Sequence, residues 1–324
     1  MSGRRVVVVT RRLPAAVEEQ LAREFDASLN REDRPLDAPA LAHALGSADG
    51  LVCTVTDRLD AQVLAVEPVR ARILANYGVG FNHIDLAAAK RRGLVVTNTP
   101  EVLTEDTADD AVMLMLMVAR RAGEGEREVR AGAWRGWRPT HLLGTKVSGK
   151  TLGLVGMGRI ARAVARRARA GFGMRVVFHD PVPPPPEVVA ELGATALASI
   201  DDVLRDADFV SLHCPASPET RHLMDARRLR LMKRGAFLIN TARGDVVDER
   251  ALVQALAAHE LAGAGLDVYE REPEVSPELL AMQNVVLLPH LGSATTETRV
   301  AMGLRVLENL TAFFAGAPPR DRVA

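Results

Sequence analysis

The segment 151–161, Thr-Leu-Gly-Leu-Val-Gly-Met-Gly-Arg-Ile-Ala, constrains the fold more than any other part of the chain. Its apolar beginning reads as a buried strand, and two closely spaced glycines then lead into a helix. Gly156 suits a tight turn, Gly158 lets backbone amides approach a phosphate, and Ala161 is small enough for the helix to lie against the strand. The free N–H groups and the positive dipole at the start of that helix favour an anion. The segment therefore predicts a βα unit that binds the pyrophosphate of a dinucleotide.

The residues that follow indicate which dinucleotide is bound. Met174–His179 reads as a second strand and delivers Asp180 about twenty residues beyond the glycines, where a ribose-binding acid belongs. A carboxylate accepts hydrogen bonds from ribose hydroxyls and repels a 2′-phosphate. We therefore expect NAD(H) to be favoured over NADP(H).

Short β-branched runs alternate with helical segments on both sides of this turn. Such alternation is typical of parallel sheets that are covered by helices on both faces. We expect an α/β protein with two doubly wound parallel-sheet domains. The expected strands are 5–10, 50–55, 72–75 and 94–97 in the first domain, and 151–155, 174–179, 207–213, 235–240, 263–268 and 285–288 in the second.

Two segments connect these domains. A long helix is predicted from Thr104, as its N-cap, to Arg121, with acids in its first turn and arginines in its last. The next segment, 123–150, is charged and without clear periodicity, and it carries Trp134 and Trp137 among several glycines. We interpret it as an extended arm. A final helix is expected at 294–315, beyond the second domain.

Composition narrows the partners and the compartment. Lys plus Arg and Asp plus Glu both total 41, so the overall charge favours neither nucleic acid nor an anionic membrane as a partner. The most apolar helix candidate, 111–119, is too short to cross a bilayer. Cys53 and Cys214 cannot form a disulfide framework, and the N-terminus lacks an apolar signal segment. We expect a cytoplasmic protein that does not bind a metal.

Three polar residues stand just past predicted strands, where ligands bind in doubly wound sheets. Arg243 follows the strand at 235–240, and its guanidinium suits a planar carboxylate. Glu272 lies in the loop after the next strand, and His290 follows the last one. An arginine for a carboxylate, a histidine for acid–base work and a carboxylate to orient that histidine together predict hydride transfer with a 2-oxo or 2-hydroxy acid.

With these motifs the chain resembles the D-isomer-specific 2-hydroxyacid dehydrogenases, and most of all their glyoxylate/hydroxypyruvate reductase-like branch. The resemblance covers nearly the whole length. It implies a flavodoxin-like substrate-binding domain, discontinuous in sequence, at 1–100 and 290–324, and a Rossmann NAD-binding domain at 101–289 with 123–150 as a dimerisation arm. The matching segments are 76–85, 96–109, 153–161, 240–245, 265–268 with Glu272-Pro273, and 289–295.

The resemblance also implies roles for individual residues. Arg243, Glu272 and His290 match the catalytic residues. The positions expected at the coenzyme are Thr107, Gly156, Met157, Gly158, Arg159, Ile160, Asp180, Cys214, Pro215, Thr220, Thr241, Ala242, Arg243, Asp267, His290 and Gly292. The positions expected at the substrate are Thr54, Val55, Val79, Gly80, Leu103, Trp137, Arg243 and His290, with the backbone amides of residues 79 and 80 binding an anion. The third glycine of the family's fingerprint is Ala161 here, which the motif tolerates.

The implied enzyme is an NAD-dependent D-2-hydroxyacid dehydrogenase that acts as a homodimer on a small 2-oxo or D-2-hydroxy acid. In the reducing direction His290 gives a proton to the carbonyl oxygen, Glu272 supports its protonated form and Arg243 binds the carboxylate. D-3-phosphoglycerate dehydrogenase or another D-2-hydroxyacid dehydrogenase remains an alternative, as does a non-catalytic NAD(H)-sensing corepressor. The residues leave open which acid is the substrate and which direction runs in the cell.

Overall fold

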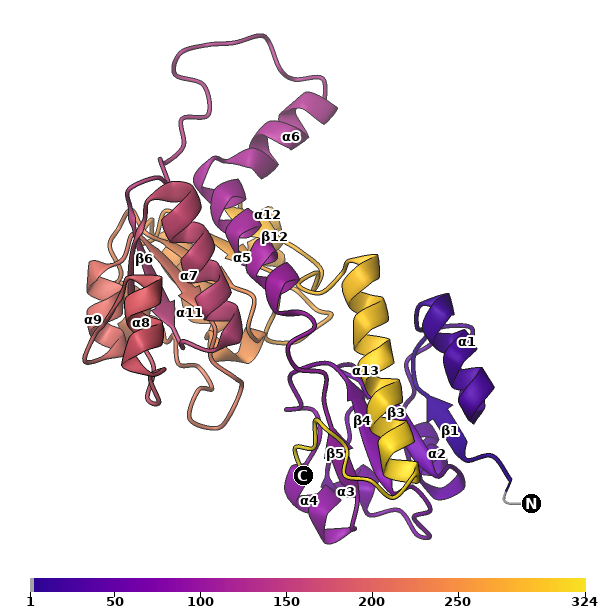
Figure 1. The fold of residues 1–324 in the computed structure, drawn as a ribbon. Coiled ribbons are helices and arrows are strands. Elements are labelled where there is room, and N and C mark those ends of the chain that lie inside the picture. Colours follow the sequence, from indigo (N-terminus) through magenta and orange to yellow (C-terminus); the bar gives the residue numbers. More distant parts are fainter. Residues whose placement is uncertain (1–2) are drawn as a thin grey trace. The chain divides into compact units, whose positions relative to one another are not determined.

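A computed structural model describes residues 3–324, and the chain divides into two compact units (Figure 1). Unit 1 runs to Leu103 and resumes from Ala294 to Ala324, and unit 2 comprises Thr104–Ser293. Each unit contains one parallel sheet, five-stranded in unit 1 and seven-stranded in unit 2. The α/β class with two doubly wound parallel sheets is thereby confirmed.

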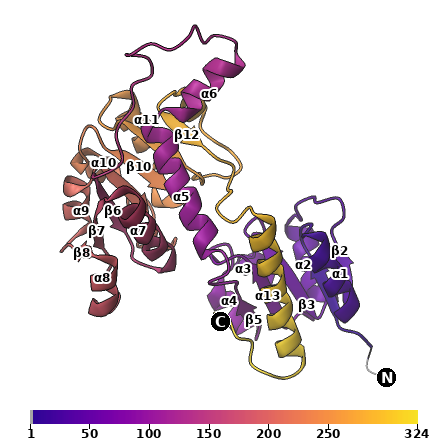
Figure 2. The same ribbon diagram turned by 45° about the horizontal axis from the view of Figure 1, so that its top comes forward.

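In unit 1 the strand order is β2-β1-β3-β4-β5. Every residue of β3 and β4 is buried, which explains why these segments read as continuous apolar runs. The last helix, α13, lies along the sheet beside β4 and α1 (Figure 2). The elements are β1 (Val6–Val9), α1 (Ala15–Glu24), β2 (Asp26–Leu29), α2 (Ala38–Ser47), β3 (Gly50–Thr54), α3 (Ala61–Leu64), β4 (Ile73–Tyr77), α4 (Leu86–Arg91), β5 (Val95–Thr97) and α13 (Thr296–Phe314).

In unit 2 the strand order is β12-β11-β10-β9-β6-β7-β8. The order reverses between β6 and β9, and this is where ligands bind in open α/β sheets. The strands are β6 (Thr151–Val155), β7 (Arg175–His179), β8 (Ala194–Ala196), β9 (Phe209–Leu212), β10 (Phe237–Asn240), β11 (Gly263–Leu266) and β12 (Val285–Leu287). The helices are α5 (Thr104–Ala119), α6 (Ala122–Arg130), α7 (Arg159–Phe172), α8 (Pro186–Leu192), α9 (Ile200–Asp206), α10 (Ala226–Leu231), the 3-10 turn η1 (Gly244–Val246), α11 (Glu249–Ala257) and α12 (Pro277–Ala281).

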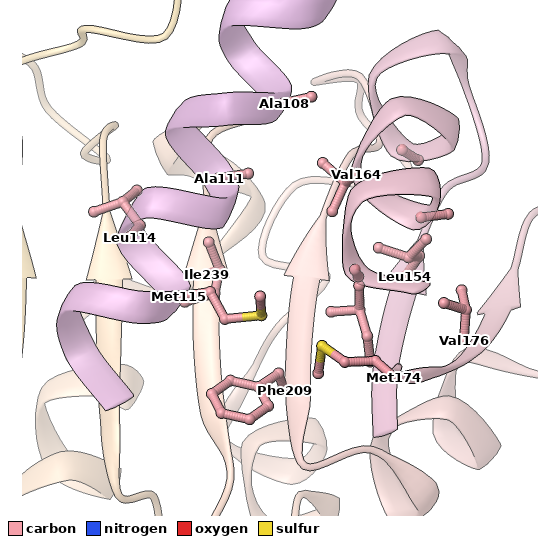
Figure 3. Packing of buried hydrophobic residues seen from close by; sticks show 14 of the residues in the cluster. Ala108, Ala111, Leu114, Met115, Leu154, Val164, Met174, Val176, Phe209 and Ile239 are labelled. Atoms are coloured by element: carbon pink, nitrogen blue, oxygen red, sulfur yellow. The ribbon is translucent and has the colours of Figure 1, made fainter. Parts of the chain in front are cut away.

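The helix α5 is buried along one face against the seven-stranded sheet and α7. Figure 3 shows Ala108, Ala111 and Met115 of α5 turned toward Val164 of α7 and Ile239 of β10. The two alanines let α5 come close to its neighbours, because small side chains keep the helix surface flat. This packing holds α5 against the sheet. Its first turn is also tied to the loop after β12, because the hydroxyl of Thr107 donates a hydrogen bond to the carbonyl of Gly292.

Two predictions about local structure are wrong, and two strands were not predicted. Thr104 is the first residue of α5 and not its cap, and the supposedly extended arm begins with the helix α6. No residue of α6 is buried, so the sequence of α6 lacks the apolar periodicity that marks a core helix. Ion pairs of Arg121 with Glu124 and of Arg130 with Glu126 help to stabilise this helix. The edge strands β2 and β8 were not predicted, because they are short and lack an apolar run.

The remainder of the arm extends beyond α6 without regular structure (Figures 1 and 2). Trp137 is 82% exposed there and Trp134 is 53% exposed. Across residues 3–324, no helix combines the length and the hydropathy that a membrane crossing needs.

Candidate active site

The glycine turn lies at the point where the order of the seven-stranded sheet reverses. Gly156 has φ +91°, and a Cβ placed on it would come within 2.9 Å of the backbone of His213, which follows β9. Only glycine fits both the conformation and the space. Gly158 is the N-cap of α7 and supplies no side chain to bond the free N–H groups of that helix. These donors are oriented toward whatever anion occupies the turn.

Asp180 is tied to the same turn. Its carboxylate accepts hydrogen bonds from the backbone N–H of Met157 at 2.6 Å and of Val182 at 2.8 Å. Each oxygen keeps a further lone pair for another donor. The side chain thus connects the end of β7 to the glycine turn, which is the arrangement expected of a ribose-binding acid.

Cys214 follows β9 next to the turn and is not a nucleophile. Burial raises the pKa of its thiol to about 11, so the reactive thiolate is scarce at neutral pH. Nearby, Thr220 donates a hydrogen bond from Oγ1 to the carbonyl of Pro215 at 2.6 Å, which closes the loop after β9.

Arg243 is carried by a short turn after β10 that Asn240 stabilises. The buried Asn240 side chain donates to the carbonyl of Arg243 at 2.9 Å and accepts from the N–H of Ala242 at 3.0 Å. Arg243 itself is half-buried, and burial lowers the pKa of its guanidinium while the carboxylates of Glu272 and Asp245 oppose that shift. The turn therefore presents a fixed cation at the carboxyl edge of the sheet.

The Arg243 turn and the loop that follows β11 touch at Gly244. A Cβ placed on Gly244 would lie 1.8 Å from the carbonyl carbon of Tyr269, so only glycine allows this approach. Glu272 belongs to the same loop and accepts a hydrogen bond from the N–H of Tyr269 at 3.1 Å. The guanidinium and the carboxylate are thus held by backbone segments in direct contact.

Glu272 and His290 form the central pair of the site, with Nδ1 of the imidazole 2.8 Å from Oε2 of the carboxylate. Burial acts to raise the Glu272 pKa, but the hydrogen bond and charge of His290, the N–H of Tyr269 and the charge of Arg243 outweigh it and the pKa is lowered. The carboxylate is therefore ionised and can only accept, so Nδ1 carries the proton. The other ring nitrogen, Nε2, is left for the reacting group.

The backbone of His290 is held in an unusual conformation. Its φ of +59° lies in the left-handed region, which non-glycine residues rarely adopt. The carboxylate of Asp267 accepts the N–H of Leu291 at 2.6 Å and of Gly292 at 2.9 Å, and Thr107 donates to the carbonyl of Gly292 at 2.8 Å. These bonds hold the loop 290–292 and with it the direction of the imidazole.

The residues of unit 2 suit a dinucleotide. The space at Gly156 is one that a Cβ would fill, and the first N–H groups of α7 have no side-chain cap. The Oγ1 of Thr241 is buried and makes no hydrogen bond among the described residues, although it lies directly after β10. In contrast, residues 3–324 contain no cluster of three His, Cys, Asp or Glu side chains that is arranged to bind a metal.

In unit 1 the predicted anion loop follows β4. The buried side chain of Asn76 donates to the carbonyls of Gly78 and Gly80, both at 3.0 Å, and Asn98 donates to the carbonyl of Val79 at 2.9 Å. Because the amides take up the carbonyls, the N–H groups of residues 79 and 80 are the groups left to bind an anion. These roles of the two asparagines were not predicted, although both stand at strand ends, where such side chains are informative.

The other predicted substrate residues of unit 1 lie at several places on that unit. Thr54 ends β3, and its Oγ1 lies 3.0 Å from that of Thr56. Val55 is 37% exposed, whereas Leu103 is buried. Of the predicted site residues, Arg243, Glu272 and His290 are brought together within unit 2, and Trp137 lies in the arm after α6.

Comparisons with known proteins agree with this geometry. Residues 112–292 match the family model described as D-isomer specific 2-hydroxyacid dehydrogenase, NAD binding domain. A glyoxylate reductase of Thermococcus kodakarensis is 46% identical over 97% of this chain and 94% of its own, and one of Korarchaeum cryptofilum is 45% identical over 98% and 95%. Among solved structures, an NADPH-dependent glyoxylate/hydroxypyruvate reductase from Sinorhizobium meliloti, in complex with NADP and malonate, has a TM-score of 0.88 at 35% identity and covers 99% of this chain and 97% of its own. The chain therefore belongs to the D-isomer-specific 2-hydroxyacid dehydrogenase family of oxidoreductases.

Proposed function

We propose that this protein is a glyoxylate/hydroxypyruvate reductase that uses a nicotinamide coenzyme. The observation that carries the proposal is the His290–Glu272 pair, 2.8 Å apart, next to Arg243 at the carboxyl edge of a sheet that also carries a dinucleotide-type glycine turn. The names of the curated relatives support glyoxylate as the substrate. The reaction converts the 2-oxo acid into a D-2-hydroxy acid.

The coenzyme supplies the hydride when it is bound, and the protein supplies the proton. Because Glu272 holds Nδ1, protonated His290 gives up the proton on Nε2 to the carbonyl oxygen of the substrate. The ionised carboxylate stabilises the imidazolium until that transfer, and it keeps the ring in one orientation. In the oxidising direction the same nitrogen takes the proton back from the hydroxyl.

Arg243 binds the acid group of the substrate. A guanidinium forms two parallel hydrogen bonds with a carboxylate, and its positive charge favours the negative charge that develops on the carbonyl oxygen. The low-dielectric surroundings that lower its pKa also strengthen this attraction, since burial reduces screening by water. Within unit 1, we propose that the N–H groups of Val79 and Gly80 bind an anionic group of the substrate.

We propose NAD(H) as the preferred coenzyme. Asp180 supports this preference, since its carboxylate suits ribose hydroxyls and repels a 2′-phosphate. The structure from Sinorhizobium meliloti holds NADP, so the same fold also accepts a 2′-phosphate. Gly156, Met157, Gly158 and the start of α7 would hold the pyrophosphate, with Thr241, Asp267 and Gly292 toward the nicotinamide.

We also propose a cytoplasmic homodimer with 123–150 as the dimerisation arm. The exposed Trp134 and Trp137, together with Leu143 at 65% exposure, give this arm an apolar surface that a second subunit would cover. In that dimer Trp137 contributes to the substrate site of the partner. The two cysteines are unpaired, which fits a reducing compartment.

The test is a spectrophotometric assay of glyoxylate, hydroxypyruvate and other 2-oxo acids with NADH and with NADPH. We expect fastest turnover with glyoxylate or hydroxypyruvate and NADH, and a loss of at least about a hundredfold in His290→Ala. Tight NADH binding without turnover of any 2-oxo acid would instead indicate a coenzyme-sensing protein. Wild-type turnover in His290→Ala contradicts the role of this residue.

A further inference from the structure

A buried carboxyl group, Asp110, lies behind the loop of His290. It stands one turn after Thr107 on α5 and is only 6% exposed, and neither of its carboxyl oxygens accepts a hydrogen bond within the described residues. An ionised carboxylate without hydrogen-bond donors is unstable in such a place. The proposed reaction leaves this group without a role.

The side chain of Asp110 instead meets that of Asp267. Asp267 is 1% exposed. Its carboxyl lies close enough to that of Asp110 for a hydrogen bond between them to raise the pKa of Asp110 and to act to lower that of Asp267. Two ionised carboxylates cannot form such a bond, so the pair shares one proton. Asp267 already accepts the N–H groups of Leu291 and Gly292, which favour its ionised form. The proton therefore lies on Asp110.

The charges around the pair agree with this assignment. Burial, the charge of Asp267 and the hydrogen bond to it raise the pKa of Asp110 to about 7, and the opposing effect of His290 is smaller. The strands β10, β11 and β12 lie against α5 and contain no ionisable side chain. On α7, Arg167 is bound by Glu105 and Asp109 and Arg166 by Glu105, so neither guanidinium is paired with Asp110. The other acid of the first turns, Asp106, has partners of its own.

We propose that Asp110 is a positioning residue that works as a neutral acid, donating a hydrogen bond to Asp267 and so fixing the loop 290–292 that carries His290. When Asp110 loses its proton, the hydrogen bond is lost and two negative charges face each other at the base of this loop. Asp267 then moves away from the N–H groups of Leu291 and Gly292, and the left-handed conformation of His290 relaxes. The effect on catalysis rests on the proposed function, whereas the protonation of Asp110 does not.

The protonation is tested on the protein without ligands. The carbonyl infrared band of a protonated carboxylic acid is followed against pH in wild type and in Asp110→Asn, which keeps a donor but has no proton to lose. We expect a band that disappears with a midpoint of about 7 in wild type and is missing from the variant. The neighbouring acid provides the control: Asp109→Asn removes an exposed carboxylate paired with Arg167 and leaves the band unchanged.

The consequence for catalysis is read from the pH profile of kcat/KM. The kcat/KM of Asp110→Asn divided by that of wild type is expected to be constant below about pH 6. Above pH 7 this ratio is expected to rise by up to about tenfold per pH unit. If the ratio of kcat/KM between Asp110→Asn and wild type is constant at all pH values, the positioning role is overturned. If wild type lacks the titrating infrared band, the proton assignment is overturned, and this result does not require Asp110→Asn to fold. A protein that shows the band but reduces no 2-oxo acid refutes the proposed function and leaves the proton assignment standing.

Discussion

Two loops at the carboxyl edges of the two sheets are held in opposite ways. In unit 1 the amide of Asn76 donates to the carbonyls of Gly78 and Gly80, and in the proposed function the backbone N–H groups of residues 79 and 80 bind an anion. In unit 2 the carboxylate of Asp267 accepts the N–H groups of Leu291 and Gly292, and the loop presents the side chain of His290. In the proposed reaction, the choice between an amide and a carboxylate at a strand end thus decides whether a loop binds an anion or transfers a proton.

Exchanging the carboxylate for an amide in unit 2 has the largest expected effect. In Asp267→Asn the new amide can accept from only one of the two N–H groups, and it also loses its bond with the protonated Asp110. We expect a loss of about a thousandfold in kcat/KM, equivalent to about 4 kcal/mol. Steady-state kinetics measure it, with Asp208→Asn as the control, because Asp208 accepts the N–H of Thr151 at the opposite edge of the same sheet. Equal losses in both variants contradict the special role of the loop.

The second-largest effect is expected on protein stability, from the ionisation of Asp110 next to the loop 290–292. The pKa of Asp110 is raised from 3.8 to about 7 on folding, so folding binds a proton between these values, and the stability from this group is complete below 3.8 and lost as pH rises through 7. Above pH 7 wild type therefore pays for a buried charge, and Asp110→Asn is expected to be more stable by about 4 kcal/mol. Urea denaturation at several pH values tests this. An advantage of the variant that does not shrink toward low pH speaks against a protonated Asp110.

The converse exchange in unit 1 has a smaller effect. Asn76→Asp cannot donate to the two carbonyls, and its negative charge opposes an anionic substrate. We expect KM for the 2-oxo acid to rise by about thirtyfold, or about 2 kcal/mol, with little change in kcat. The matched control is Asn284→Asp, whose amide donates to Ala262 at the far end of the seven-stranded sheet. If Asn76→Asp changes only kcat, the loop after β4 acts in the chemical step and not in substrate binding, which contradicts the proposed difference between the two loops.

The smallest effect is expected at the coenzyme. Asp180→Ala removes a carboxylate that bonds the glycine turn and, by the proposal, the ribose. We expect the preference for NADH over NADPH to fall by about tenfold, or 1.4 kcal/mol. The ratio of kcat/KM for the two coenzymes is the measurement, and Glu187→Ala, an exposed acid in α8, is the control. An unchanged ratio shows that the preference is set elsewhere.

The sequence predicted those features that depend on local patterns. The glycine turn, the helix α7 and the residues just past the strands follow from spacing and residue type, and the same reasoning selected Arg243, Glu272 and His290 as candidate catalytic residues. The helix α6 and the strands β2 and β8 were missed because tertiary contacts and ion pairs, rather than apolar periodicity, sustain them. Asp110 was missed for a related reason, since only the fold places this helical acid against Asp267.

The contact at Gly244 limits how the enzyme can be altered. Because the backbone of Tyr269 fills the space at this glycine, the Arg243 turn and the Glu272 loop are packed directly against each other. Inserting or deleting residues in either segment separates the guanidinium from the carboxylate. Lengthening either loop to admit bulkier acids is therefore expected to disturb this pair. Thr54 and Val55, which the resemblance implies at the substrate, are the positions that we propose for mutant libraries.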